Sequence, residues 1–131
     1  MVKLGDSEPV GACADTGAEV SLISTELLHR AKVAFDWASL SDGYPVKGIG
    51  PTPQNSKTMI TKLTFLHESY PLTITVALSV IDSIDYRFLI GRDILRPLKY
   101  RISDEGLSLT APKSGKVTLF PYAAASAFSL S

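Results

Sequence analysis

The segment Cys13-Ala-Asp-Thr-Gly-Ala-Glu-Val-Ser-Leu-Ile23 sets a polar turn between two apolar runs. The turn holds the triplet Asp15-Thr16-Gly17, in which an acidic residue stands directly at the end of the first apolar run. A triplet of this kind occurs by chance in about one of fifty chains of this length at ordinary composition. The triplet alone is therefore compatible with a plain polar turn between two strands and with a loop that carries chemistry.

Short apolar runs separated by turn residues fill the rest of the chain, which is typical of an all-β barrel or sandwich. The clearest run is 72–80, where apolar and polar residues alternate over most of its length, as in a half-buried strand. Helix signals are sparse and limited to 24–30, with Ser24 as N-cap, and 92–96, which Pro97 ends. Further strands are expected at 1–4, 10–14, 58–66, 87–90, 100–102 and 107–110.

Composition narrows the class of protein. The chain has 131 residues, 45% of them apolar, which suffices to bury about two thirds of its surface around one core. Its 13 basic and 13 acidic residues balance, which argues against a basic nucleic-acid binder and an electrostatic membrane anchor. A single cysteine, Cys13, excludes a disulfide framework within the chain and suits a reducing compartment. No run approaches the ~18 apolar residues of a membrane span, and the first residues lack the pattern of a secretory signal.

Two further segments give the triplet a context. Phe88-Leu-Ile-Gly-Arg-Asp-Ile-Leu95 sets apolar residues and a glycine before a short helix that begins Arg-Asp, and Tyr44-Pro-Val-Lys-Gly-Ile-Gly50 is a glycine-rich stretch between the two. In their order and spacing, the three segments resemble features of retroviral-type aspartic proteases. Residues 13–23 resemble the active-site loop, 44–50 the tip of the flap, and 88–95 the second signature of that family. The resemblance covers about residues 2–98. It implies an all-β fold, a small closed β-barrel-like structure with one short C-terminal helix.

The resemblance also implies roles for the triplet. Asp15 is the catalytic acid/base, Thr16 hydrogen-bonds across a dimer, and Gly17 lets the substrate backbone approach closely. Proteases of this kind need two carboxylates that share one proton. The chain has one such triplet and is far shorter than a two-lobed pepsin, so the active enzyme is expected to be a homodimer with the site on its two-fold axis. One lobe of a pepsin-like enzyme is an alternative, although the usual serine after the glycine is missing.

Substrate contacts are implied for the loop after the triplet and for the flap. Glu19 stands where the family usually has aspartate, and its expected partner is Arg92, in an ion pair that braces the loop against the short helix. The implied substrate-binding residues are Ala18, Glu19, Val46, Lys47, Gly48, Ile49 and Gly50. No metal or other cofactor is expected, because His29 and His67 have no cysteine or clustered acids at ligand spacing.

The chain departs from the family pattern at both ends. Family members commonly begin with an extra strand, whereas the residues before Asp15 suffice for the first hairpin alone. The part after the second signature is longer than usual, so we expect the dimer sheet to be built from strands at 99–110 and 116–120. The protease domain is expected to span 1–111, and 112–131 to form a C-terminal strand and a frayed, Ala/Ser-rich tail.

The expected function is that of an aspartic endopeptidase that cleaves a polypeptide substrate. Polyprotein processing for a retrovirus or retrotransposon, in the cytoplasm or within a virus or virus-like particle, fits best, and a domain of a host protein is an alternative. No nucleic acid or membrane partner is expected. The rival of a different class is a catalytically inactive module for dimerisation or peptide binding. The intact triplet argues against it, because a binding module needs no carboxylate at Asp15.

Overall fold

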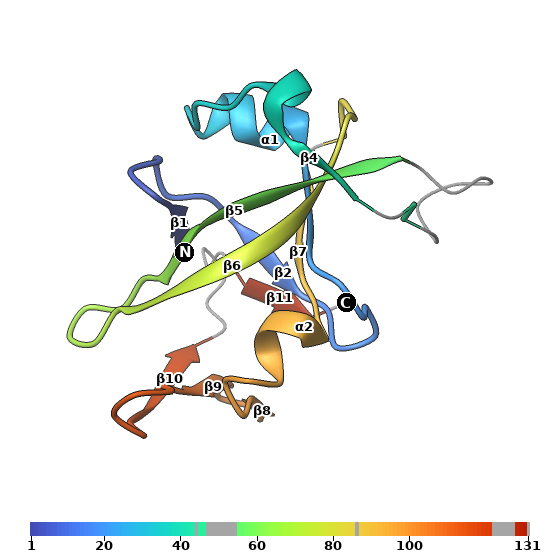
Figure 1. The fold of residues 1–131 in the computed structure, drawn as a ribbon. Helices are drawn as coiled ribbons and strands as arrows, with labels where there is room; N and C mark the ends of the chain where they lie inside the picture. Colours follow the sequence, from blue (N-terminus) through green and yellow to red (C-terminus); the bar gives the residue numbers. More distant parts are fainter. Residues whose placement is uncertain (44, 47–54, 86, 122–127, 131) are drawn as a thin grey trace.

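The computed structural model describes residues 1–43, 45–46, 55–85, 87–121 and 128–130. One curled sheet dominates it, with the strand order β1-β5-β6-β3-β7-β2-β11 and with β4 paired to β5. Its strands are β1 (Val2–Leu4), β2 (Ala12–Ala14), β3 (Leu22–Ser24), β4 (Ser41–Asp42), β5 (Ser56–Phe65), β6 (Leu72–Ile81), β7 (Phe88–Ile90) and β11 (Phe128–Leu130). Figure 1 shows the sheet as a curled half-barrel, which confirms the expected all-β, barrel-like architecture.

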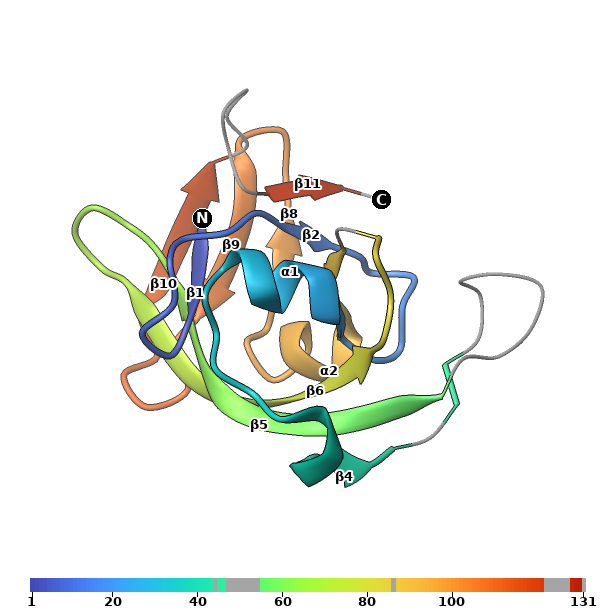
Figure 2. The ribbon, with the colours of Figure 1, turned by 90° about the horizontal axis from the view of Figure 1, so that it is seen from above.

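The hairpin of β5 and β6 forms the wall of the half-barrel. The two strands pair in antiparallel register from Ser56 opposite Ile81 to Phe65 opposite Leu72. The predicted alternation holds through the middle of β6, where Val76 and Leu78 are buried and Thr75 and Ala77 are exposed, and it ends at Val80 and Ile81, which are both buried. Viewed from above, the hairpin curves around both helices (Figure 2). Its inner face therefore supplies one side of the core.

The core lies between this hairpin, the short strands and the helices. Ile23, Leu28, Ile90 and Leu95 are fully buried there, although they come from four separate elements. Burial of each such side chain is worth about 1.5–3 kcal/mol. The strands and helix that flank the Asp15 turn are consequently held in place by the main hydrophobic cluster.

In the described residues, two short helices pack against the sheet, and a 3-10 turn spans Trp37–Ser39. Helix α1 (Thr25–Arg30) begins where the sequence predicts, since the Ser24 hydroxyl accepts a hydrogen bond from the Leu27 N–H. Helix α2 (Arg92–Leu95) is the expected short C-terminal helix and begins after Gly91. No helix in the described ranges is long and apolar enough to span a membrane.

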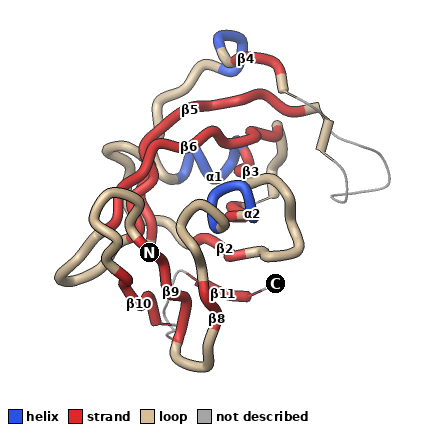
Figure 3. Tube along the Cα trace, turned by 60° about the horizontal axis from the view of Figure 1, so that its bottom comes forward, coloured by secondary structure: helices blue, strands red, loops and turns tan. Residues whose placement is uncertain are grey.

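The C-terminal part forms the strands expected at 100–102, 107–110 and 116–120, and a further strand at 128–130. Strands β8 (Arg101–Ile102), β9 (Gly106–Thr110) and β10 (Val117–Pro121) make a separate three-stranded sheet (Figure 3). Strand β11 then returns to the main sheet and runs parallel to β2. The expectation of a frayed tail is wrong for residues 128–130, because backbone pairing with a strand of the main sheet outweighs their weak local preference for a strand.

Candidate active site

Asp15 lies where strand β2 ends and the chain turns. Strand β2 pairs in parallel with β7, and the Asp15 N–H donates to the Ile90 carbonyl at 2.9 Å. The Gly17 N–H donates to the Asp15 Oδ1 atom at 3.0 Å, and the Ala18 N–H to the Asp15 carbonyl at 3.2 Å. These bonds form an Asx-type turn. They fix the half-buried Asp15 side chain through Oδ1, whereas Oδ2 has no hydrogen-bond partner among the residues that the structure describes.

Gly17 and Thr16 complete the triplet. A Cβ atom at Gly17 would lie 3.3 Å from Asp15 Oδ1, so a side chain there would press on the carboxylate. The half-buried Thr16 hydroxyl has no hydrogen-bond partner within the described part of this chain. The triplet thus presents one carboxylate oxygen and one hydroxyl that this chain leaves unpaired.

The loop after the triplet packs directly on the second signature segment. A Cβ atom at Gly91 would lie 2.8 Å from the carbonyl oxygens of both Ala18 and Val20, so only glycine allows this approach. The next two backbone N–H groups close the contact, because Arg92 donates to the Ala18 carbonyl at 2.9 Å and Asp93 to the Glu19 carbonyl at 3.2 Å. The start of α2 therefore serves as a platform for the loop that carries Asp15.

A buried serine and an aspartate, neither of which was predicted as a site residue from the sequence, hold this platform together. Ser21 is fully buried; its N–H donates to Asp93 Oδ2 at 3.0 Å and its hydroxyl to Asp93 Oδ1 at 2.6 Å. The same hydroxyl accepts from the Gly91 N–H at 2.8 Å. The available signal was the presence of a hydroxyl residue after one motif and an acidic residue in the other, but nothing in the sequence links the two.

The ion pair expected between Glu19 and Arg92 is present. Arg92 Nη2 lies 3.5 Å from Glu19 Oε1, with the Glu19 side chain 84% exposed and that of Arg92 30% exposed. Such an exposed pair contributes about 0–1 kcal/mol. The backbone bonds and the Ser21–Asp93 contact, rather than this pair, hold the loop.

Of the substrate-binding flap residues predicted from the sequence, Val46 is the one that lies within the described residues. Val46 is buried against Leu22 and Ile81, with the half-buried Leu89 beside them. Its side chain joins a small apolar cluster in this chain, and its contact with substrate stays a prediction. The other flap residues named from the sequence lie outside the described residues: Lys47, Gly48, Ile49 and Gly50.

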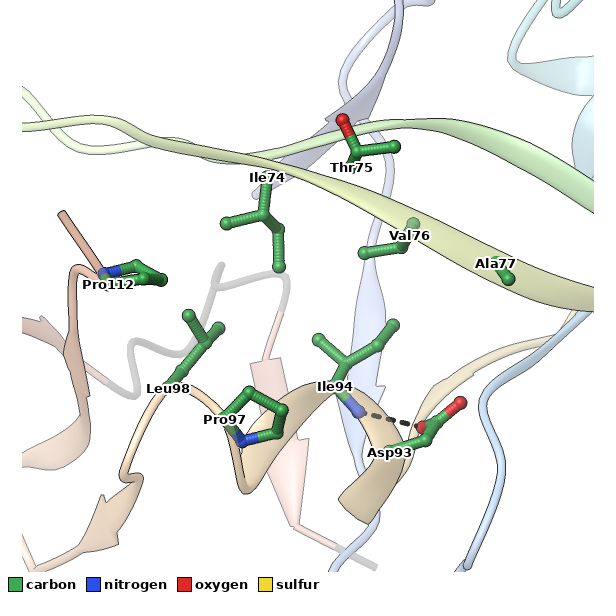
Figure 4. Close-up of a pocket in the computed structure, with 9 residues that line it drawn as sticks. All are labelled: Ile74, Thr75, Val76, Ala77, Asp93, Ile94, Pro97, Leu98 and Pro112. Carbon is green, nitrogen blue, oxygen red and sulfur yellow. Dashed lines mark hydrogen bonds between the residues drawn. The ribbon is translucent and has the colours of Figure 1, made fainter.

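Two hollows flank helix α2. One, of about 340 Å³, lies between β6 and α2 and is mostly apolar, with Ile74 and Val76 facing Ile94 and Leu98 (Figure 4). The other, of about 270 Å³, is lined by Glu19, Arg92, Asp93 and Arg96 and adjoins the loop that follows the triplet. Across the described ranges, no three histidine, cysteine or acidic side chains gather as metal ligands would.

This arrangement offers one carboxylate on a braced turn. A single carboxyl group can take up a proton or give one, but hydrolysis of a peptide bond needs both acts on opposite sides of the reacting carbon. The Asp15 turn presents one such group.

Known proteins share the motifs and the fold. The sequence profile of the family described as retroviral aspartyl protease matches residues 1–103. Among solved structures, the EIAV protease complexed with the inhibitor HBY-793 is similar, with a TM-score of 0.54 and 25% sequence identity. That similarity covers 78% of this chain and 88% of the other. No curated protein matches the chain.

Proposed function

This chain belongs to the retroviral aspartyl protease family, and from that premise we propose that it is an aspartic endopeptidase active as a homodimer. Each subunit contributes one Asp15, and the two carboxylates meet across a two-fold axis with a water molecule between them. Family and fold support aspartic-protease-type activity. The single observation that carries the residue assignment is the Asp15 turn, which leaves one carboxylate oxygen unpaired on a rigid platform.

The reaction divides between the two carboxyl groups. The ionised Asp15 removes a proton from water as the water oxygen attacks the peptide carbon. The protonated Asp15 of the other subunit gives its proton to the carbonyl oxygen. The tetrahedral diol then collapses: the C–N bond breaks, the leaving nitrogen takes the proton that the first Asp15 removed from water, and one diol proton passes to the Asp15 that had protonated the carbonyl oxygen. The two groups share one proton because two ionised carboxylates so close together would repel each other.

The other residues of the loop support this chemistry. We assign the unpaired Thr16 hydroxyl to a hydrogen bond with the partner subunit, which would hold the two Asp15 turns at a constant separation. Gly17 leaves room for the substrate backbone, and Ala18, Glu19 and the flap segment from Val46 onward bind it. The substrate is a polypeptide, and a retroviral or retrotransposon polyprotein processed in the cytoplasm or a particle is the proposed source.

Hydrolysis of a peptide mixture by purified protein tests the assignment. The wild-type chain should cleave peptides and be blocked by a statine-type inhibitor, which carries a hydroxyl in place of the attacking water. Asp15→Asn should reduce turnover to below a few per cent while circular dichroism shows the fold unchanged. Asp6→Asn, in the exposed turn that follows β1, is the matched control and should retain activity. Inhibitor-sensitive cleavage by Asp15→Asn, or none by the wild type, contradicts the proposed function.

A further inference from the structure

One peptide unit, between Ile90 and Gly91, holds both ends of the loop that carries Asp15. Its carbonyl oxygen, on Ile90, accepts a hydrogen bond from the Asp15 N–H at 2.9 Å. Its N–H, on Gly91, donates to the Ser21 hydroxyl oxygen at 2.8 Å. The carbonyl and the N–H of a peptide unit lie in one plane, so a rotation of that plane would disturb both hydrogen bonds together. Ser21 therefore constrains the group to which the backbone of Asp15 is bound.

The Ser21 hydroxyl is fixed both as an acceptor and as a donor. It is fully buried, and it donates its own proton to Asp93 Oδ1 at 2.6 Å, a short bond that is typical of a hydroxyl on a carboxylate. Asp93 is held in turn, because Oδ2 accepts from the Ser21 N–H at 3.0 Å and Oδ1 from the Ile94 N–H at 2.9 Å. Hydrogen bonds in such a chain polarise one another. Asp93 thus strengthens the bond that the Ser21 hydroxyl receives from Gly91.

The middle of the loop is held by other hydrogen bonds. The Ala18 carbonyl accepts from the Arg92 N–H at 2.9 Å. The Glu19 carbonyl accepts from the Asp93 N–H at 3.2 Å. Both donors are backbone groups of α2, and neither bond involves the Ser21 hydroxyl. Loss of that hydroxyl would therefore disturb the carboxylate at the start of the loop more than the two residues proposed to bind substrate.

We propose that Ser21, oriented by Asp93, is a positioning residue for the Asp15 carboxylate, and that it acts through the peptide unit 90–91. This role rests on the proposed function, in which two Asp15 carboxylates share a water molecule and one proton across the dimer axis. A misplacement of about 1 Å can reduce catalysis about a hundredfold. Even a small displacement of each Asp15 turn should consequently lower kcat. KM should change little, because the loop residues that bind substrate keep their anchors on α2.

A second buried serine provides the matched control. Ser24 is fully buried like Ser21. Its hydroxyl also accepts backbone hydrogen bonds, from the Leu27 and Arg87 N–H groups, each at 3.2 Å. With rates expressed per dimer, as counted by sedimentation, Ser21→Ala should lower kcat about tenfold and change KM by less than about twofold. Ser24→Ala should lose a comparable amount of stability in urea, because it also removes a buried acceptor, and keep kcat at the wild-type level.

Conservative variants separate the hydroxyl from the shape of the side chain. Ser21→Thr keeps a hydroxyl and Ser21→Val puts a methyl group in its place, so the threonine variant should have the higher kcat by about tenfold. Asp93→Asn offers one acceptor oxygen in place of two, and should lower kcat when Ser21 is present but change it little in Ser21→Ala. Because Asp93 is exposed, this variant tests the role even if the Ser21 variants fail to fold.

Amide hydrogen exchange, followed by NMR, tests the connection independently of activity. In Ser21→Ala the Gly91 N–H loses its acceptor, and both this group and the Asp15 N–H should lose protection against exchange. In Ser24→Ala the same two groups should exchange as in the wild type. Unchanged protection of the Asp15 N–H in Ser21→Ala would overturn the connection through the peptide unit.

The kinetic results separate this role from the protease assignment. With the wild type active and Asp15→Asn inactive, an unchanged kcat in Ser21→Ala overturns the positioning role and leaves the protease assignment intact. Equal losses of kcat in Ser21→Ala and Ser24→Ala, or equal kcat in Ser21→Thr and Ser21→Val, overturn it in the same way. Absence of cleavage by the wild type overturns the proposed function and the positioning role with it, whatever the exchange rates are.

Discussion

At the scale of single residues, Ser21 and Asp93 connect the Asp15 turn to helix α2. Ser21→Ala would remove a donor to Asp93 and leave the Gly91 N–H without its acceptor, in a buried setting. We expect the free energy of unfolding in urea to fall by about 1–3 kcal/mol. Asp93→Ala should cost a similar amount, and the double variant less than the sum of the two, because both break one network. Additive effects would show that the two residues act separately.

The residues of the site differ in how far the sequence could identify them. The Glu19–Arg92 pair could be placed because both residues belong to motifs with a known spatial relation. The Ser21–Asp93 contact could not, because it joins positions 72 residues apart and neither side chain is unusual in its own segment. The close approach of Gly91 to the Ala18 carbonyl likewise depends on packing between two strands. Sequence patterns predicted Asp15 as the reacting group, and the structure was needed to show what holds its turn.

At the scale of elements, the sheet of β8 to β10 carries the proposed dimer contact. Ile102 on β8 is 41% exposed and Val117 on β10 is 62% exposed, although both are apolar. Deleting the whole sheet is an unsuitable test, because Leu107, Leu109 and Phe120 belong to the core.

Substitution of Val117, which lies opposite Thr110 on the face away from Leu107 and Leu109, tests this interface while the core stays intact. Val117→Asp should sediment as a monomer at micromolar concentration and lose activity in proportion, because a charge would be buried in the contact. Ile60→Asp is the matched control: Ile60 on β5 is 73% exposed and lies outside the proposed interface. A dimeric, active Val117→Asp variant would place the interface elsewhere.

Strand β11 protects the edge of the strand that leads to Asp15. It pairs with β2 in parallel, from Phe128 opposite Ala12 to Leu130 opposite Ala14. A chain that ends at Pro121 would leave this edge of β2 unpaired. We expect a lower midpoint of unfolding in urea and a loss of peptide hydrolysis, both compared with the full chain. An unchanged midpoint together with full activity would show that β11 contributes nothing to the site.

The elements were predictable where the signal is local. The alternation in β6 predicted a half-buried strand, since a period of two residues marks one face of a sheet. Helix α1 was predictable from its Ser24 cap. Strand β11 was not, because its pairing with β2 joins segments more than a hundred residues apart and depends on the tertiary fold.

At the scale of the whole molecule, the central claim is that one active site needs two chains, each with its own Asp15. The chain has a single Asp-Thr-Gly triplet, so a mixed dimer of wild type and Asp15→Asn holds one carboxylate and is expected to be inactive. If the dimers exchange at random, the fraction with two carboxylates equals the square of the wild-type fraction.

The most direct measurement refolds wild type and Asp15→Asn together at several ratios and constant total concentration, and then records peptide hydrolysis. Sedimentation of each mixture checks that the chains remain dimeric. Activity should follow the square of the wild-type fraction, so that an equal mixture retains about one quarter of the wild-type rate. A linear dependence, with about half the rate in the equal mixture, would mean that each chain acts alone and would contradict a site shared between two subunits.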